Sequence, residues 1–222
     1  MRLTGFHTSL RGAIAAVAAA VMVAAVAGCD PPNPPRVAVA GEQTATGDDA
    51  VEQDQLQLTD IHGRRQQPFD DPQTTAVVLV FVLQDCPIAN SYIPELNRLH
   101  ADYEPRGIQL LLVQVDAQAS IEDLRKHAQE YRVEFPVVWD ERHAWVQTTG
   151  ATITPEASVL SPGGELLYRG RIDDRHVAFG KRPEATTHDL RDALDAILAG
   201  RPIAQPRTQA VGCFILNVAP EK

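Results

Sequence analysis

Residues 76–87 read AVVLVFVLQDCP and carry the clearest structural signal in the chain. The first eight residues are continuously apolar and mostly β-branched, with no polar position for a wet face, and this predicts a buried central strand. Gln84-Asp85-Cys86-Pro87 follows as a turn, and apolar residues then recur at helical spacing: Ile88, Tyr92, Leu96, Leu99 and Tyr103. The stretch therefore predicts a strand, a turn that carries a cysteine, and a helix over 88–103.

The position of Cys86 gives it a physical reason to be reactive. Pro87 suits a first helical turn, where its missing N–H costs nothing, and Pro94 should kink the helix rather than end it. Backbone N–H groups and the helix dipole at such a terminus stabilise a thiolate and lower the thiol pKa below its free value of ~8.5. Asp85 should oppose this effect if its carboxylate lies close to the thiol.

Strand and helix signals alternate along the rest of the chain. Ile108–Val115 and Phe135–Trp139 read as further strands, and Ser120 caps a helix that runs to about Tyr131. Residues 157–160 and 165–170 predict a hairpin across the turn 161–164. A last helix spans 187–199, and a short edge strand is expected within 211–216. This order predicts one α/β domain with a central mixed sheet flanked by helices.

The N-terminus has the form of an export signal. Arg2 and Arg11 precede an unbroken apolar run at 13–28, which is shorter than the roughly 20 residues that span a bilayer. Val26-Ala27-Gly28-Cys29 resembles the lipobox of bacterial lipoproteins, which implies that Cys29 is lipidated after removal of residues 1–28. The alternatives are an ordinary signal peptide with an accidental cysteine and a permanent transmembrane helix.

Residues 29–53 are rich in Pro, Gly, Thr and acidic residues, and we expect them to form a disordered tether before a domain at 54–222. Loss of Arg2 and Arg11 leaves 18 basic against 29 acidic residues, a net charge of −11, so a nucleic-acid partner is not expected. We expect no cofactor. The protein should be exported, lipid-anchored to the membrane and exposed to the periplasm or the outside.

If Cys29 carries lipid, Cys86 and Cys213 are the two remaining cysteines, in a compartment where disulfides persist. Cys213 could resolve a mixed disulfide formed on Cys86. Alternatively, the two residues could form a static disulfide that ties the C-terminal tail to the domain. Their separation of 127 positions in the sequence says nothing about their distance in space.

The order of strand, Cys86-Pro87, helix and Thr154-Pro155 before a hairpin resembles the thioredoxin and redoxin superfamily. The resemblance implies that Pro155 is cis and lies, with Thr154, against the active cysteine. More narrowly, three segments resemble redoxin-domain proteins related to alkyl hydroperoxide reductase and thiol-specific antioxidant, common in environmental bacteria such as planctomycetes. These segments are Asp85–Tyr92, Tyr168–Asp174 and Val211–Ile215.

Two residues depart from the sequence pattern of that superfamily and limit the reactions expected at Cys86. Ala89 stands where thioredoxins carry their second cysteine, which excludes a CxxC cycle. Leu83 stands where peroxiredoxins keep a threonine or serine, so efficient peroxidase chemistry is not expected, although Arg169 or Arg171 could act as the positive partner.

Copper chaperones use a CxxxC pair and a histidine, and a soft three-ligand site would here need Cys86, Cys213 and His176 together. His176 is more simply a solvated loop residue. We interpret the other histidines of the folded region as surface or capping residues: His62, His100, His127, His143 and His188.

These features predict an extracytoplasmic thiol-disulfide oxidoreductase in which Cys86 attacks and Cys213 resolves. Its partners would be a protein thiol or disulfide and an external reductant. A weak peroxidase, a Cu(I)-binding chaperone and a redox-inert binding module remain as alternatives.

Overall fold

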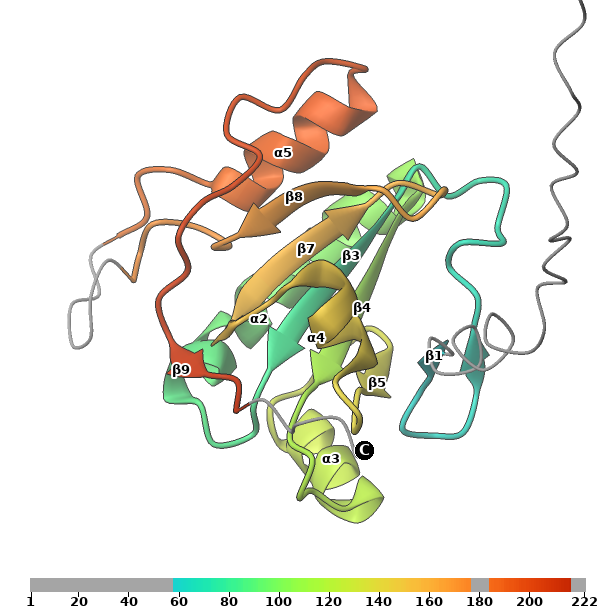
Figure 1. Cartoon of the computed structure of the whole chain (residues 1–222), viewed down its shortest axis with the longest axis vertical. Coiled ribbons are helices and arrows are strands. Elements are labelled where there is room, and N and C mark those ends of the chain that lie inside the picture. The colour runs from blue at the N-terminus through green and yellow to red at the C-terminus, as the bar shows by residue number, and fades with distance from the viewer. Residues whose placement is uncertain (1–57, 177–183, 217–222) are drawn as a thin grey trace, which may run out of the picture. The chain divides into compact units, whose positions relative to one another are not determined.

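A computed structural model describes residues 58–176 and 184–216. Its main sheet has the strand order β5-β4-β3-β7-β8 (Figure 1). The strands are β3 (Ala76–Val82), β4 (Ile108–Gln114), β5 (Val137–Trp139), β7 (Glu156–Leu160) and β8 (Leu166–Gly170). β3, β4 and β5 are parallel, whereas β7 is antiparallel to both of its neighbours. The sheet is therefore mixed, as the sequence predicts.

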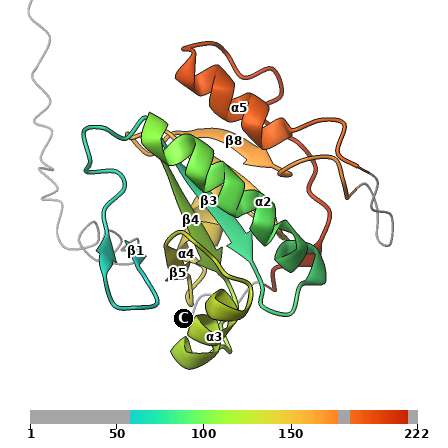
Figure 2. The same cartoon turned by 180° about the vertical axis from the view of Figure 1, so that it is seen from behind.

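The central strand β3 is buried on both faces, and each of its residues has 0% exposed surface. Val78 and Val80 face a core with the helices α2 (Pro87–Tyr103) and α5 (Asp189–Leu198), which cover one side of the sheet (Figure 2). Val77, Leu79 and Phe81 face the opposite core, with the short helix α4 (Ala144–Thr149). Alternating side chains thus fill two cores, which explains why the run has no polar position.

The helices follow their sequence signals closely. Helix α2 begins at Pro87, continues through Pro94 and ends at a short 3₁₀ turn, η1 (Glu104–Arg106). Ser120 caps α3 (Ile121–Glu130) and forms a capping box with Asp123, as its hydroxyl accepts the Asp123 N–H at 3.1 Å. Both predicted helix starts are therefore confirmed.

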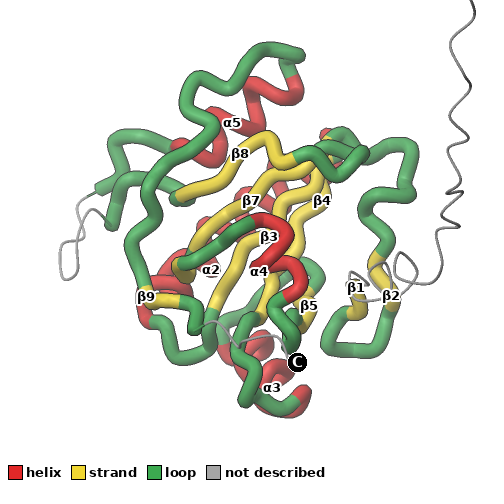
Figure 3. The backbone as a smooth tube through the Cα atoms, in the orientation of Figure 1, coloured by secondary structure: helices red, strands yellow, loops and turns green. Residues whose placement is uncertain are grey.

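Two small sheets lie apart from the main sheet. One pairs β1 (Leu58–Thr59) with β2 (Arg65–Gln66), and the other pairs β6 (Ile153–Thr154) with β9 (Cys213–Phe214). The short strand expected within 211–216 is thus β9, which pairs with β6 and not with the main sheet. Figure 3 shows β9 apart from the labelled strands of the main sheet. The sequence patterns did not predict β1, β2 or β6, because strands of two residues show no periodicity.

The predicted signal at 1–28, Cys29 and the tether at 29–53 lie outside the described residues. Within 58–176 and 184–216, no helix is long and apolar enough to cross a membrane.

His62 and His188 lie on the surface, as predicted. The same interpretation is wrong for His127, which is 6% exposed, whereas His143 is 2% exposed but occupies the N-cap position of α4.

Candidate active site

Cys86 is the N-cap residue of α2, at the end of the turn that follows β3. Its backbone N–H donates to the carbonyl of Leu83 at 3.1 Å, and its sulfur accepts the N–H of Ala89 at 3.5 Å. Pro87 occupies the first helical turn, as predicted. The helix N-terminus therefore presents a backbone donor to Cys86, as a stabilised thiolate requires.

Thr154 and Pro155 lie on the other side of the thiol. The Thr154–Pro155 peptide bond is cis, as the family resemblance implies. The Cys86 thiol donates to the Thr154 carbonyl oxygen at 3.2 Å, and Thr154 itself is fully buried. β6 therefore forms one wall of the site, next to the N-terminus of α2.

Cys213 reaches the site on β9. Cys213 is paired with Thr154 in the antiparallel register of β6 and β9, and the Thr154 hydroxyl donates to the Cys213 carbonyl at 3.3 Å. β9 lies beside the start of α2 in both views (Figures 1 and 2). Both cysteines are free thiols, and each shifts the pKa of the other. The fold therefore brings together two cysteines that are 127 residues apart.

The two thiols differ in acidity. Burial raises the pKa of Cys86, but hydrogen bonds from the Cys213 thiol and the Ala89 N–H outweigh burial and lower it below the ordinary value. Burial and the shared hydrogen bond raise the pKa of Cys213 to about 11. Cys86 is therefore the more acidic of the two thiols, and the more acidic thiol is the more readily ionised one.

We expect Cys213→Ala to raise the pKa of Cys86, because the substitution removes a hydrogen bond to the thiolate. At neutral pH the thiolate fraction of Cys86 should fall accordingly. The ultraviolet absorbance of the thiolate, followed over a pH titration, measures this shift. Cys213→Ser, which keeps a hydroxyl donor, is the matched control and should shift the pKa less. An unchanged pKa in Cys213→Ala would contradict the hydrogen-bond assignment.

The two candidate arginines have carboxylate partners away from the thiol. Arg169 donates to the carbonyls of Thr149 and Gly150 at 3.0 and 2.6 Å, and lies 3.5 Å from Glu156. Within the described part of the chain, neither Arg169 nor Arg171 makes a hydrogen bond or ion pair with Cys86.

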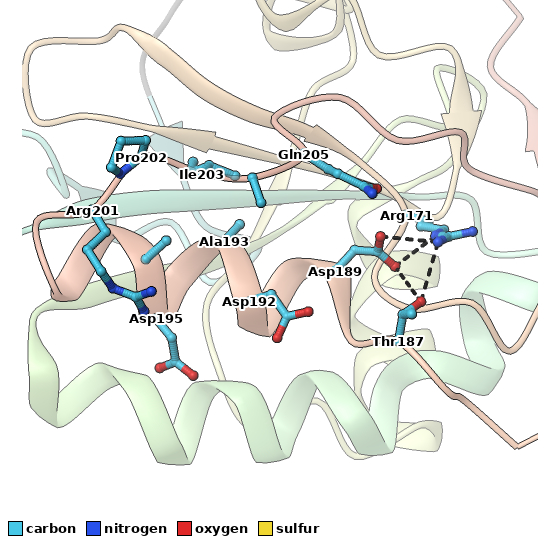
Figure 4. A pocket seen from close by; sticks show the side chains of 12 residues that line it. Arg171, Thr187, Asp189, Asp192, Ala193, Asp195, Arg201, Pro202, Ile203 and Gln205 are labelled. Carbon is cyan, nitrogen blue, oxygen red and sulfur yellow. Dashed lines mark hydrogen bonds and ion pairs between the residues drawn. The ribbon is translucent and has the colours of Figure 1, made fainter.

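Arg171 binds Asp189 at 2.8 and 3.1 Å, at one end of a cavity of about 500 Å³ next to α5 (Figure 4). The hydrogen bonds to Asp189, strengthened by its charge, raise the pKa of Arg171. This arginine therefore belongs to the α5 side of the fold.

Asp85 and His176 are the remaining candidate residues near the turn. Asp85 is exposed, and its negative charge favours the protonated form of the His127 ring. The pKa of Cys86 lies below its ordinary value, and not above it. His176 Nε2 lies 3.3 Å from the Ser91 hydroxyl, and its ring packs against Tyr92. Among residues 58–176 and 184–216, no three His, Cys, Asp or Glu side chains gather to hold a metal ion. The three-ligand site of Cys86, Cys213 and His176 is therefore not formed.

A buried polar network behind the turn was missed by sequence reasoning. Asn90 donates to the Gln84 carbonyl at 2.7 Å, and its side-chain oxygen lies 2.9 Å from His127 Nε2. Gln114 Nε2 lies 3.1 Å from the other ring nitrogen of His127. The network ties α2 and α3 to the turn that carries Cys86. One signal was present: His127 lies three residues after the buried Leu124, on the inward face of α3.

Comparisons with known proteins agree with this geometry. The model of the AhpC/TSA family matches residues 47–169, more than half of the chain. This range includes Cys86 and Pro155 but ends before Cys213. No curated protein matches the chain.

Several solved structures are similar. An uncharacterised conserved protein from Geobacillus kaustophilus is 28% identical with a TM-score of 0.62, over 75% of this chain and 89% of its own. A hypothetical protein from Sinorhizobium meliloti is 25% identical with a TM-score of 0.64, over 74% and 91%. A putative thiol:disulfide interchange protein DsbE from Chlorobium tepidum is 22% identical with a TM-score of 0.50, over 64% and 92%. The last likeness shows the thioredoxin-like fold alone.

Proposed function

Because this chain belongs to the AhpC/TSA family of thiol redox proteins, we propose that it is a thiol-disulfide oxidoreductase in which Cys86 attacks and Cys213 resolves. The observation that carries the proposal is that β9 places Cys213 opposite Thr154, whose carbonyl oxygen lies 3.2 Å from the Cys86 sulfur. Ala89 stands three residues after Cys86, so the partner thiol has to come from elsewhere in the chain. Cys213 meets that requirement.

The reaction has two exchange steps. The Cys86 thiolate attacks one sulfur of a substrate disulfide, forms a mixed disulfide and releases the first substrate thiolate. Cys213 then loses its proton and attacks the Cys86 sulfur, which forms the Cys86–Cys213 disulfide and releases the second substrate thiolate. The two thiolates take up protons, so the substrate gains two electrons and the protein loses two. An external dithiol reductant would restore the reduced pair.

Disulfide exchange explains the site better than peroxide reduction. Leu83 occupies the place of the peroxide-positioning threonine or serine and has no hydrogen-bond donor in its side chain. Arg169 and Arg171 are engaged with Glu156 and Asp189, so neither supplies a positive charge for a peroxide beside Cys86. Both observations support a disulfide, rather than a peroxide, as the substrate.

The cellular setting is part of the proposal. The signal-like residues 1–28 and the lipobox-like Cys29 would export the chain and anchor it by lipid, facing the periplasm or the outside. In that compartment a protein disulfide or thiol is an available partner. Labelling with a fatty acid, compared between the unmodified chain and Cys29→Ala, tests the anchor.

The reduction potential tests the redox pair. We expect the purified full chain, in detergent, to form a Cys86–Cys213 disulfide with a potential between ~−120 and −270 mV, the range of catalytic dithiols. Thiol trapping and mass spectrometry across a dithiothreitol redox series measure it. A potential below ~−300 mV would instead indicate a structural disulfide, and absence of this disulfide would remove the resolving role of Cys213.

A further inference from the structure

Cys86 is covered, although it lies at a helix N-terminus beside the turn. It is 1% exposed, and Thr154 next to it has no exposed surface. β9 lies over this side of the site, with Cys213 partly exposed and Phe214 74% exposed on its outer side. A thiolate must line up with the disulfide that it attacks, so a substrate disulfide cannot reach a cysteine that is 1% exposed in this arrangement.

The segment that carries β9 is anchored firmly at its N-terminal end. The Arg169 N–H donates to the Pro206 carbonyl at 3.0 Å, and the Thr208 N–H donates to the Arg169 carbonyl at 3.1 Å. The Thr208 hydroxyl bonds the Tyr168 hydroxyl at 2.7 Å and the Arg171 N–H at 3.0 Å. A Cβ on Gly170 would overlap Thr208, so a glycine is needed for this approach. Residues 206–208 are therefore part of the β8 edge.

Beyond Thr208 the segment contacts β6 and its neighbours, and the Thr154 hydroxyl donates to the Cys213 carbonyl at 3.3 Å. The Ile215 N–H donates to the Thr152 carbonyl at 3.0 Å, and β9 pairs with β6 over two residues. The Ile215 side chain is buried, whereas Leu216 is 81% exposed. A two-stranded pair of this length has little stability of its own. Residues 209–216 can therefore open while residues 206–208 stay bound.

Gly212 controls how closely β9 approaches the site. A Cβ at this position would overlap the carbonyl of Thr154, the same carbonyl that accepts the Cys86 thiol hydrogen. Only a residue without a side chain lets the backbone cross at this point. The close approach of β9 to Thr154 thus requires Gly212, which can be changed without altering either cysteine.

We propose that residues 209–216 form a gate that closes Cys86 in the resting reduced protein and must leave β6 before an external disulfide can react. This inference rests on the proposed function for its purpose, because the segment that leaves also carries Cys213. Its departure lets the Cys86 thiolate attack the substrate disulfide and expel the first thiolate. Its return brings Cys213 to the mixed disulfide, where it attacks the Cys86 sulfur and expels the second.

The rate of alkylation of Cys86 tests the gate. The full chain with Cys213→Ser, reduced and in detergent, is treated with iodoacetamide at a pH where Cys86 is fully ionised, and the modified peptide is identified by mass spectrometry. Adding Gly212→Ala should accelerate alkylation of Cys86 by ~10-fold or more, because it unseats β9. Gly163→Ala is the matched control, since its Cβ would meet only Ser161 Oγ at 3.7 Å. Equal rates in the two variants would overturn the proposal.

A second variant and a second measurement cover the case in which Gly212→Ala does not fold. Ile215→Ala removes the buried side chain of the gate, leaves the backbone intact, and should also accelerate alkylation. In the unmodified chain, the Ile215 amide should exchange hydrogen at least ~10-fold faster than the Thr208 amide. Exchange of both amides at one slow rate would show that the segment does not open.

The two proposals can fail separately. Alkylation and hydrogen exchange report access to Cys86 and need no redox partner. A chain with a potential below ~−300 mV could still show an opening gate, and a catalytic pair could still have a segment that stays closed.

Discussion

Replacement of Cys86 by serine should abolish catalysed reduction of a model disulfide. The serine hydroxyl does not ionise at neutral pH, and Cys213 does not substitute for the lost thiolate because burial raises its pKa. The rate should fall on the order of 10²-fold or more, to that of uncatalysed exchange. Release of substrate thiol, followed in the presence of a dithiol reductant, measures it.

Cys213→Ser is the matched variant and should fail at a different step. Cys86 can still attack, so the variant should form a mixed disulfide with the substrate that persists, because the resolving thiol is missing. Mass spectrometry of the intact protein would show the added substrate mass. Full turnover by Cys86→Ser would refute Cys86 as the nucleophile, and full turnover by Cys213→Ser would refute only the resolving role.

Leu96→Ala should cause the largest loss of stability among these variants. Leu96 has no exposed surface and lies in the core between α2 and the main sheet. Truncation of such a side chain leaves a cavity and typically costs about 2–5 kcal/mol in the free energy of unfolding. Chemical denaturation of the full chain, followed by circular dichroism, measures the loss.

Leu216→Ala is the same substitution at a position that is 81% exposed, and its effect should stay within about 0.5 kcal/mol. A loss below about 1 kcal/mol for Leu96→Ala would contradict its place in the core. Because Leu96 lies on the helix that presents Cys86, the folded variant should keep the acidity of this thiol. Loss of acidity without unfolding would show that the helix start depends on packing at Leu96.

The candidate site has two parts, one within the residues that match the AhpC/TSA family and one in the C-terminal segment. The matched residues 47–169 contain the turn, the cis proline and the central strands. Cys213 and its anchor at Thr208 follow the match. The Tyr168–Arg171 motif connects the two parts, since Tyr168, Arg169 and Arg171 all bond to residues 206–208. These residues therefore hold the C-terminal segment through the Tyr168 hydroxyl and through the backbone of Arg169 and Arg171.

Local patterns were enough to locate most elements and half of the site. β3 could be predicted because every residue in 76–82 is apolar, and α3 because Ser120 and Asp123 form a cap within one turn. Cys86 at a helix start follows from residues that are neighbours in the sequence. Such signals are readable because the interactions that produce them lie within a few residues of one another.

Three features of the site could not be predicted from local patterns. They are the proximity of Cys86 and Cys213, the partners of Arg169 and Arg171, and the burial of His127. Each depends on contacts between residues far apart in the chain: β9 against β6, Arg171 with Asp189, and His127 with Asn90. Residue type does not specify which distant segment a side chain meets, because long-range contacts form only when the whole core packs. The closure of Cys86 under β9 has the same origin, since exposure depends on which segments lie over a residue and not on its neighbours in sequence.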